Sequence, residues 1–433
     1  RGIHICKSMV AWQKFGEGET PESSGMKGDK LVGKYYVIFD QKYKAQIAEL
    51  VEAGKTKEEA EKEAPIMKEA QEMLLKWEQK DPETYALWEK MNGWVYKGFE
   101  NTYKTMGVDF DKLYYESQTF SLGKEEVLRA VEEGIAYKKE DGSVWIDLTE
   151  DGLDEKLLLR KDGTSVYMTQ DIGTAILRYR DFPKIEQQIY TVGNEQEYHF
   201  KVLFIILAKL GYEWAKNCYH LSYGMVDLPT GKMKSREGTV VDADDLMEDM
   251  FATAKSRTDE LGKIDGFNAE EAQELYRQLG LGALKYYLLK VDPVKRMMFN
   301  PEESIDFQGN TGPFIQYVHA RICAILRKAE QLGIEPKVSE KLNSLEPTEN
   351  NVLQLIIDFP NKIEEAAAGY APSIIANYVY EVAKAYNKFY SEVSIFNESD
   401  QEALAFRIGF SKIVAETIEK SMNLLGAEVP EKM

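Results

Sequence analysis

Apolar positions between about 41 and 106 recur with the spacing of amphipathic helices. Met73 and Trp77, and further along Leu87, Met91 and Val95, are separated by four residues each, within stretches rich in Lys and Glu. One face of an α-helix repeats every 3.6 residues, so this pattern predicts helices with a charged outer surface. We expect these residues to form a helical insertion.

Residues 1–40 have a different texture. Turn-forming residues gather at Gly16–Gly18 and at Thr20–Pro21, and an aromatic and β-branched run follows at 35–39. Such runs between turn residues are typical of short strands. We therefore predict short loops and strands for this part of the chain.

Strand and helix patterns alternate between about 108 and 228. Strands are predicted at 157–160, 165–168, 188–192 and 220–223, the first two joined by the Lys161-Asp162-Gly163 turn. Thr169 is the predicted N-cap of an intervening helix, with Asp171 in its first turn. Alternating strands and helices predict a doubly wound parallel sheet, which binds its ligands at the carboxyl ends of the strands. Three polar clusters follow predicted strand ends, at 167–171, 193–196 and 224–236, and we expect them to meet in one crevice.

From about Val240 the pattern is helical. A helix predicted from Phe314 to about Leu332 carries one apolar face and one polar face. The apolar face consists of Ile315, Val318, Ile322 and Ile325, and the polar face of Tyr317, Arg321 and Lys328. With the helices that follow, it predicts an α-helical bundle.

Composition limits the classes of function. The 433 residues carry a formal net charge of -19, which disfavours general binding to a nucleic-acid backbone, so a polyanion must meet local basic patches. The 3 Cys and 4 His lie far apart without metal-ligand spacing, which predicts reduced thiols, no structural metal and a cytoplasmic setting. Apolar runs are far shorter than the roughly 20 residues of a membrane span.

One local basic patch stands out against this charge. Lys232, Lys234 and Arg236 lie within five residues, between Gly231 and Gly238. Glycines let a backbone close over a ligand, and fixed cations neutralise charge on departing phosphates. A solvated basic turn is the alternative interpretation of this segment taken alone.

Several ordered motifs carry a family resemblance. They are Lys161 to Ile172, Tyr190 to Phe200, Gly224 to Pro229 with the Lys-Met loop, Asn310 to Arg321, and the closing Val429 to Met433. Together the chain resembles the arginyl-tRNA synthetases, a class I aminoacyl-tRNA synthetase family. The match spans nearly the whole chain in order, and the last two motifs resemble that family's anticodon-binding domain.

The resemblance implies an α/β plus all-α fold: an incomplete Rossmann-like parallel sheet with a helical insertion, followed by a helical anticodon-binding bundle. We expect a catalytic domain at 1–240, its insertion at about 41–106, a helical linking region at 241–308 and the bundle at 309–433. The implied activity is arginine-tRNA ligase: ATP-dependent activation of L-arginine to arginyl-adenylate, then transfer to the 3′ end of tRNA(Arg). Mg²⁺ accompanies ATP, and we expect a monomer without membrane association.

The resemblance also implies roles for particular residues. Arginine presents a planar guanidinium with five donors, so its site needs a carboxylate and further acceptors. The implied roles are arginine binding by Tyr167, Asp171 and Gln196, ATP binding by Gly224, Met225, Val226 and His199, transition-state stabilisation by Lys232, Lys234 and Arg236, and tRNA binding by Tyr317, Arg321, Lys328 and Met433. From the residues alone, Asp171 could equally stabilise its helix and Tyr167 could pack, and the acidic bundle could pack on the catalytic part without binding RNA.

Two departures from the class I pattern affect this expectation. The usual Lys-Met-Ser-Lys-Ser signature has its second lysine at the fourth position, where this chain has Ser235, with Lys234 one residue earlier. The His-Ile-Gly-His signature does not occur in the sequence, which starts at Arg1 within a motif. We expect a fragment that lacks the N-terminal part of its family's catalytic domain.

Two other classes of function are compatible with the same residues. One is a different nucleotidyl-transferring enzyme of class I, and the other is a noncatalytic RNA-binding or scaffold protein. Arginine should stabilise the chain against heat only under the arginine hypothesis, which separates it from the first alternative. The upstream reading frame would separate it from the second.

We predict that the 433-residue chain alone does not catalyse arginine-dependent exchange of pyrophosphate into ATP, because the His-Ile-Gly-His signature is missing. The measurement is incorporation of labelled pyrophosphate into ATP with and without arginine. Measurable arginine-dependent exchange would contradict the prediction.

Overall fold

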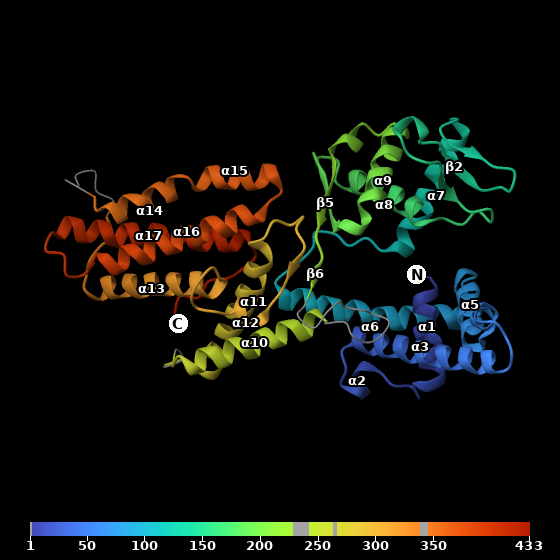
Figure 1. Ribbon diagram of the computed structural model, residues 1–433, viewed down its shortest axis with the longest axis horizontal. Coiled ribbons are helices and arrows are strands. Elements are labelled where there is room, and N and C mark those ends of the chain that lie inside the picture. The colour runs from blue at the N-terminus through green and yellow to red at the C-terminus, as the bar shows by residue number, and fades with distance from the viewer. Residues whose placement is uncertain (1, 228–241, 263–265, 338–344) are drawn as a thin grey trace. The chain divides into compact units, whose positions relative to one another are not determined.

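The computed structural model describes residues 2–227, 242–262, 266–337 and 345–433 (Figure 1). It divides into two compact units. Of the described residues, the first unit contains 2–185 and 202–215, and the second contains 186–201, 216–227 and those from 242 onward.

Helices fill the N-terminal part of the first unit. They are α1 (Ile3–Phe15), α2 (Pro21–Ser24), α3 (Gly28–Glu52), α4 (Lys57–Glu63), α5 (Pro65–Glu78) and α6 (Pro82–Met106). The prediction of loops and strands over 1–40 is therefore wrong. The aromatic run at 35–39 lies within α3, where Leu31, Tyr35 and Phe39 are fully buried at four-residue spacing. That spacing is helical, and the aromatic residues between these positions obscured it.

A small antiparallel sheet comes next. It consists of β1 (Tyr137–Lys138), β2 (Val144–Ile146) and β3 (Lys156–Leu159), in that order, with the 3₁₀ turn η1 (Thr149–Asp151) between β2 and β3. The prediction of a strand at 157–160 is close to β3, but β3 pairs antiparallel with β2 and not with the parallel strands. Since a hairpin-like turn follows β3, its natural partners are antiparallel neighbours.

Helices α7 (Glu116–Glu132) and α8 (Tyr167–Asp181) pack on this sheet. Within 165–168, Ser165 forms an isolated bridge to Leu159 of β3, and Tyr167 already begins α8. The prediction of a strand at 165–168 is therefore wrong. The N-cap is Val166, not Thr169. Thr169 is buried and its hydroxyl donates to the Leu158 carbonyl, which ties the start of α8 to β3. Asp171 consequently lies beyond the first turn of the helix.

Glycines allow α7 and α8 to approach closely. A Cβ added at Gly123 would lie 1.8 Å from the Thr169 carbonyl oxygen, and one added at Gly173 would lie 2.5 Å from the Gly123 nitrogen. Backbone atoms cannot withdraw from such a contact without moving a helix. This crossing fixes the position of α8 against α7.

The predicted parallel pairing is confirmed in the second unit. Strand β4 (Gln188–Gly193) pairs with β5 (Cys218–Tyr223) in parallel register, from Gln188 opposite Cys218 to Gly193 opposite Tyr223. The connection runs through η2 (Asn194–Gln196), α9 (Glu197–Lys209) and η3 (Glu213–Asn217). This is a strand–helix–strand crossover of the doubly wound type.

A second parallel pair and the remaining helices complete this unit. The pair is β6 (Val226–Asp227) with β7 (Met297–Met298). The helices are α10 (Ala243–Glu260), α11 (Ala269–Leu289), α12 (Pro301–Ser304), α13 (Gly312–Gln331), α14 (Pro347–Ile357), α15 (Phe359–Gly369), α16 (Pro372–Glu392) and α17 (Gln401–Leu424). None of the helices in the described ranges has the length and hydropathy to cross a membrane.

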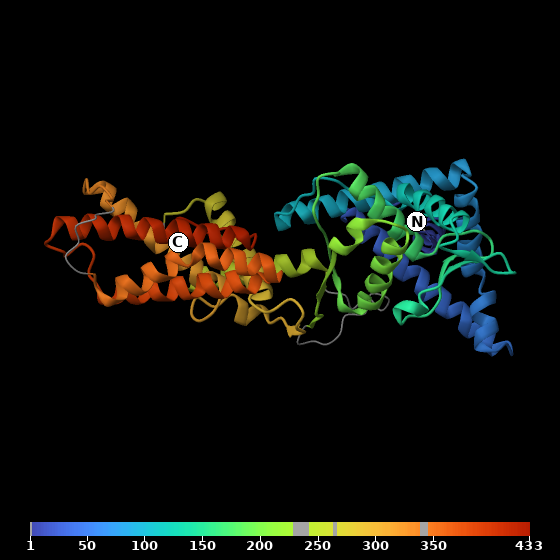
Figure 2. The ribbon, with the colours of Figure 1, turned by 90° about the horizontal axis from the view of Figure 1, so that it is seen from above.

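The predicted helical bundle is confirmed. Its long orange and red helices run alongside one another in Figure 2, and α13 packs against both α16 and α17. The apolar face predicted for α13 is buried: Ile315, Val318, Ile322 and Ile325 join one core. Asp242 caps α10 through its side chain, as its place before Ala243 predicts.

We predict that Gly123→Ala lowers the free energy of unfolding of the first unit by about 1–3 kcal/mol, because the added methyl must displace backbone of α8. The measurement is urea unfolding of both proteins. Gly33→Ala is the matched control, since a Cβ at this glycine of α3 meets nothing within 4 Å. It should be neutral or stabilising by about 0.5–1 kcal/mol. Equal midpoints for Gly123→Ala and the unsubstituted chain would refute the close crossing.

Candidate active site and tRNA-binding face

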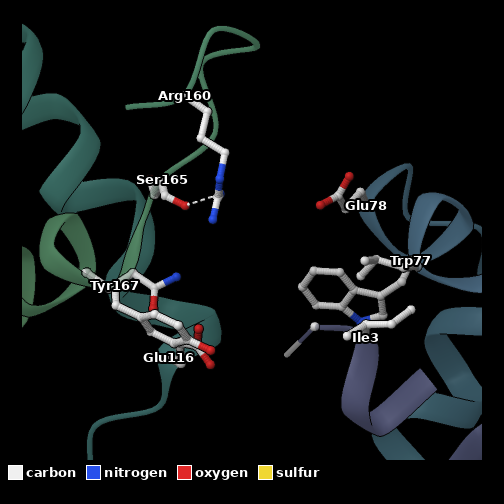
Figure 3. A pocket seen from close by; sticks show the side chains of 10 residues that line it. Ile3, Trp77, Glu78, Glu116, Arg160, Ser165 and Tyr167 are labelled. Atoms are coloured by element: carbon white, nitrogen blue, oxygen red, sulfur yellow. Dashed lines mark hydrogen bonds between the residues drawn. The ribbon is translucent and has the colours of Figure 1, made fainter. Parts of the chain in front are cut away.

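The start of α8 opens onto a cavity of about 250 Å³ in the first unit. Tyr167, the first residue of α8, is 75% exposed and lines this cavity. The other lining residues are Gly2, Ile3, Leu74, Trp77, Glu78, Glu116, Arg160, Ser165 and Gln170. Figure 3 shows the side chains of Trp77 and Glu78 facing Tyr167 across the open space.

Glu116 is a site residue that sequence reasoning missed. It is the first residue of α7, and in Figure 3 its side chain lies beside Tyr167. The sequence offers one signal, an acidic residue at the start of a predicted helix, but gives no indication that Glu116 and Tyr167 line one cavity.

Arg160 holds the wall of the same cavity. Its Nη1 donates to the Ser165 carbonyl at 2.9 Å (Figure 3). The same nitrogen donates to the Thr164 hydroxyl at 3.2 Å. These bonds connect the end of β3 to the residues that precede α8. Asp171, one helical turn beyond Tyr167, is partly buried and lies on the same face of α8. Asp171 does not line this cavity, and its place in one pocket with Tyr167 stays a prediction.

The third predicted arginine ligand belongs to the other unit. Gln196 ends η2, just after the carboxyl end of β4, and is exposed. Its meeting with Tyr167 and Asp171 stays a prediction. Two of the three predicted clusters do meet: a Cβ added at Gly193 would lie 3.6 Å from the Tyr223 ring and 3.9 Å from the Met225 sulfur.

Residues Gly224 to Asp227, which include three predicted ATP ligands, are held by backbone bonds to the segment 293–299. The Gly224 N–H donates to the Pro293 carbonyl at 2.7 Å, and the Phe299 N–H donates to the Asp227 carbonyl at 2.8 Å. The Met225 carbonyl accepts from Met297 at 3.1 Å. A Cβ at Gly224 would lie 2.4 Å from the Lys295 carbonyl, so only glycine fits there.

Val226 lies between these bonded residues, and alternate residues of a strand direct their backbone groups to opposite sides. Its N–H and C=O therefore point away from β7, and the residue is 36% exposed. His199 lies in the first turn of α9, with its ring edge-to-face against Phe200 at 5.6 Å. The predicted catalytic cations Lys232, Lys234 and Arg236 lie outside the described residues.

The cations on the polar face of α13 contact side chains of α16 and of the loop that follows it. The Arg321 guanidinium lies 4.7 Å from the Tyr317 ring and 5.0 Å from the Tyr390 ring, and it donates to the Asn387 side-chain oxygen. Further along α13, the Lys328 ammonium lies 4.3 Å from the Phe396 ring. Tyr390, Asn387 and Phe396 were missed because they come from α16 and the loop after it, more than 60 residues away in the sequence.

The C-terminal residues, which include the predicted tRNA contact Met433, run back along α13. Gln316 Nε2 donates to the Glu428 carbonyl at 2.7 Å, and Arg327 Nη1 donates to the Glu431 carbonyl at 3.0 Å. His319 Nδ1 contacts the Pro430 carbonyl at 3.0 Å, so that nitrogen carries a proton and donates it. Burial lowers the pKa of His319 below its ordinary value, so the ring is neutral at pH 7.

Two family models match the chain. One describes "tRNA synthetases class I (R), catalytic domain" and matches residues 35–300, and the other describes the "DALR anticodon binding domain" and matches residues 315–433. The arginine-tRNA ligase of Flavobacterium psychrophilum is 61% identical over 433 residues, covering 100% of this chain and 71% of the relative. The arginine-tRNA ligase of Bacteroides fragilis is also 61% identical, covering 100% of this chain and 72% of the relative.

The chain belongs to the class I arginyl-tRNA synthetase family.

Solved structures of arginyl-tRNA synthetases share the fold. The Thermus thermophilus enzyme superposes with a TM-score of 0.80 at 22% identity, covering 100% of this chain and 74% of that one. The Plasmodium falciparum enzyme superposes with a TM-score of 0.73 at 19% identity, covering 99% of this chain and 68% of that one. The fold class predicted from the sequence, a Rossmann-like catalytic domain with a helical insertion and a helical anticodon-binding domain, is confirmed.

The family assignment also confirms the activity class, which is that of an arginine-tRNA ligase, with ATP as the substrate that class I enzymes use. Among the described residues, no group of three or more His, Cys, Asp or Glu side chains is arranged to hold a metal ion.

Proposed function

We propose that this arginyl-tRNA synthetase family member binds the arginine side chain at the start of α8, through Tyr167, Asp171, Gln196 and, in addition, Glu116. The observation that carries the proposal is that Tyr167 and Glu116 line one cavity, with Asp171 one turn along the same helix face. The opening of the cavity toward solvent supports entry of a small polar substrate.

The chemistry of these side chains suits a guanidinium. The group is a planar cation with five donors and no acceptor, so it binds carboxylates and neutral oxygens and gains nothing from donors. Glu116 and Asp171 supply charge, and the Tyr167 hydroxyl and the Gln196 amide oxygen supply neutral acceptors. An uncharged isostere would lose the ionic contact with these carboxylates, so a site of this kind rejects it strongly.

ATP, as its Mg²⁺ complex, is proposed to bind at the carboxyl edge of β4 and β5. The backbone N–H and C=O of Val226 match the acceptor and donor on the edge of adenine, with Gly224 and Met225 beside it and His199 on the neighbouring helix. In the first step the arginine carboxylate attacks the α-phosphorus of ATP, the bond to the bridging oxygen breaks, and pyrophosphate leaves. Lys232, Lys234 and Arg236 are proposed to stabilise the charge on the departing pyrophosphate.

In the second step the ribose hydroxyl of the tRNA 3′-terminal adenosine attacks the arginyl carbonyl, and AMP leaves with the bonding electrons. Neither step needs an enzyme nucleophile. Catalysis then depends on positioning and charge stabilisation. This fits a site made of hydrogen-bond acceptors, backbone groups and cations.

We predict that L-arginine raises the melting temperature of the chain and that citrulline, its uncharged isostere, does not. Ligand at 100 times its Kd stabilises by about 2.7 kcal/mol, which a thermal-shift measurement resolves. Glu116→Gln and Asp171→Asn should each weaken arginine binding about 10- to 100-fold, because each removes a charged hydrogen-bond acceptor. Glu132→Gln, at the exposed far end of the same helix as Glu116, is the matched control. Equal shifts by arginine and citrulline would refute the proposed pocket.

We also propose that the face formed by Tyr317, Arg321 and Lys328, together with Met433, binds the anticodon loop of tRNA(Arg). The partly exposed Tyr317 ring, the exposed Tyr390 ring and the cations match unstacked bases and phosphates, the features by which proteins recognise single-stranded RNA. Residues 309–433 carry 12 Lys and Arg against 17 Asp and Glu, so average charge does not attract RNA to this bundle. Local contacts must provide the affinity.

We predict that Arg321→Gln weakens binding of tRNA(Arg) about tenfold, since it removes a charged hydrogen bond worth roughly 1.5 kcal/mol. The measurement is a filter-binding titration of the chain at two salt concentrations, with tRNA(Arg) and with a transcript that carries a substituted anticodon. Lys420→Gln, an exposed cation on α17, should leave binding unchanged. If the two transcripts bind the unsubstituted chain equally, the bundle does not read the anticodon.

A further inference from the structure

The β6–β7 pair carries an ion pair that no motif predicts. Arg296, just before β7, donates through Nε and Nη2 to the two carboxylate oxygens of Asp227, the last residue of β6. The Nη2–Oδ1 distance is 2.9 Å. The ion pair thus links β6 to β7 at the same place as the backbone hydrogen bonds of Met225 and Asp227.

This ion pair contributes little to the stability of the fold. The Arg296 side chain is 57% exposed and that of Asp227 is 22% exposed. Ion pairs at such exposed sites contribute about 0–1 kcal/mol, because water screens them and long side chains lose entropy when they are held. A purely stabilising role therefore does not account for the two-point contact.

A two-point contact does define orientation. The guanidinium fork meets a carboxylate in one planar arrangement, which a lysine ammonium cannot reproduce. Here the fork sets the position of Asp227, and with it β6, relative to β7. The same short segment includes Gly224, Met225 and Val226, whose backbone would contact adenine.

We infer that Arg296 is a positioning residue for ATP, which acts through Asp227 by holding β6 in the orientation that presents the Val226 backbone to adenine. The inference rests on the proposed nucleotide site. Arg296 itself does not touch the nucleotide, so its effect is on the base and not on the phosphates. Removing the Arg296 guanidinium should therefore weaken the binding of adenosine and the binding of ATP by the same factor.

The test is equilibrium dialysis of the 433-residue chain with ATP and, separately, with adenosine. Arg296→Gln and Asp227→Asn should each raise the Kd for ATP and the Kd for adenosine on the order of tenfold. That is the effect expected when a binding group is slightly displaced. Arg296→Lys keeps the charge but loses the fork, so it should bind both ligands as weakly as Arg296→Gln does. The double variant Arg296→Gln with Asp227→Asn should bind them no more weakly than either single variant, because the two residues act as a unit.

Arg257→Gln provides a matched control. Arg257 forms an exposed ion pair with Glu260 on α10, at 3.3 Å with 52% and 59% exposure, so its loss should leave ATP binding unchanged. Melting temperatures measured in parallel should agree within the scatter for all variants.

The outcomes separate the inference from the proposed function. If the unsubstituted chain binds ATP and adenosine, and Arg296→Gln binds both equally well, the positioning role is refuted and the nucleotide site stands. A loss for ATP alone, with adenosine unchanged, also refutes it, because Arg296 would then act on the phosphates. If the unsubstituted chain binds neither ligand, the nucleotide site itself is refuted.

Discussion

The parallel pairing of β4 with β5 is the constraint on which the proposed nucleotide site depends. Parallel strands end at the same edge of a sheet, so the register that places Gly193 opposite Tyr223 also brings Gln196 and Gly224 to that edge. From there the chain runs directly into β6, whose backbone is bonded to residues 293–299. A one-residue slip between β4 and β5 would turn every side chain to the opposite face and separate these groups.

The proposed amino-acid pocket depends on a different kind of contact, the glycine crossing of α7 and α8. Gly123 lets the Thr169 backbone come close, which fixes α8 against α7, and the first residues of the two helices, Glu116 and Tyr167, line one cavity. In the proposed pocket, the Glu116 and Asp171 carboxylates would supply the negative charge that a guanidinium requires.

The sequence predicts those features that depend on local periodicity. Strands β4 and β5 and the buried face of α13 each follow from the residue pattern within one element. Local patterns are wrong, however, for the strand at 165–168 and for the N-cap of α8. Prediction from the sequence also fails over 1–40, where aromatic residues between helical positions resemble a strand. It also misses Glu116, Arg296 and Tyr390, because each becomes a candidate only through a partner that is distant in the sequence. Local patterns therefore give the scaffold, and the tertiary contacts complete the sites.

The acidic bundle shows why such contacts matter for recognising a polyanion. With more carboxylates than cations over 309–433, the long-range field repels RNA, and a flexible exposed cation would be offset by its neighbours. The Arg321 guanidinium lies against two tyrosine rings and donates to the Asn387 side-chain oxygen, and these contacts define its position. A group that is already ordered loses little entropy on binding and offers its remaining N–H donors in a fixed direction. If this face binds the anticodon loop as proposed, the affinity must come from such short-range, directional contacts and not from net charge.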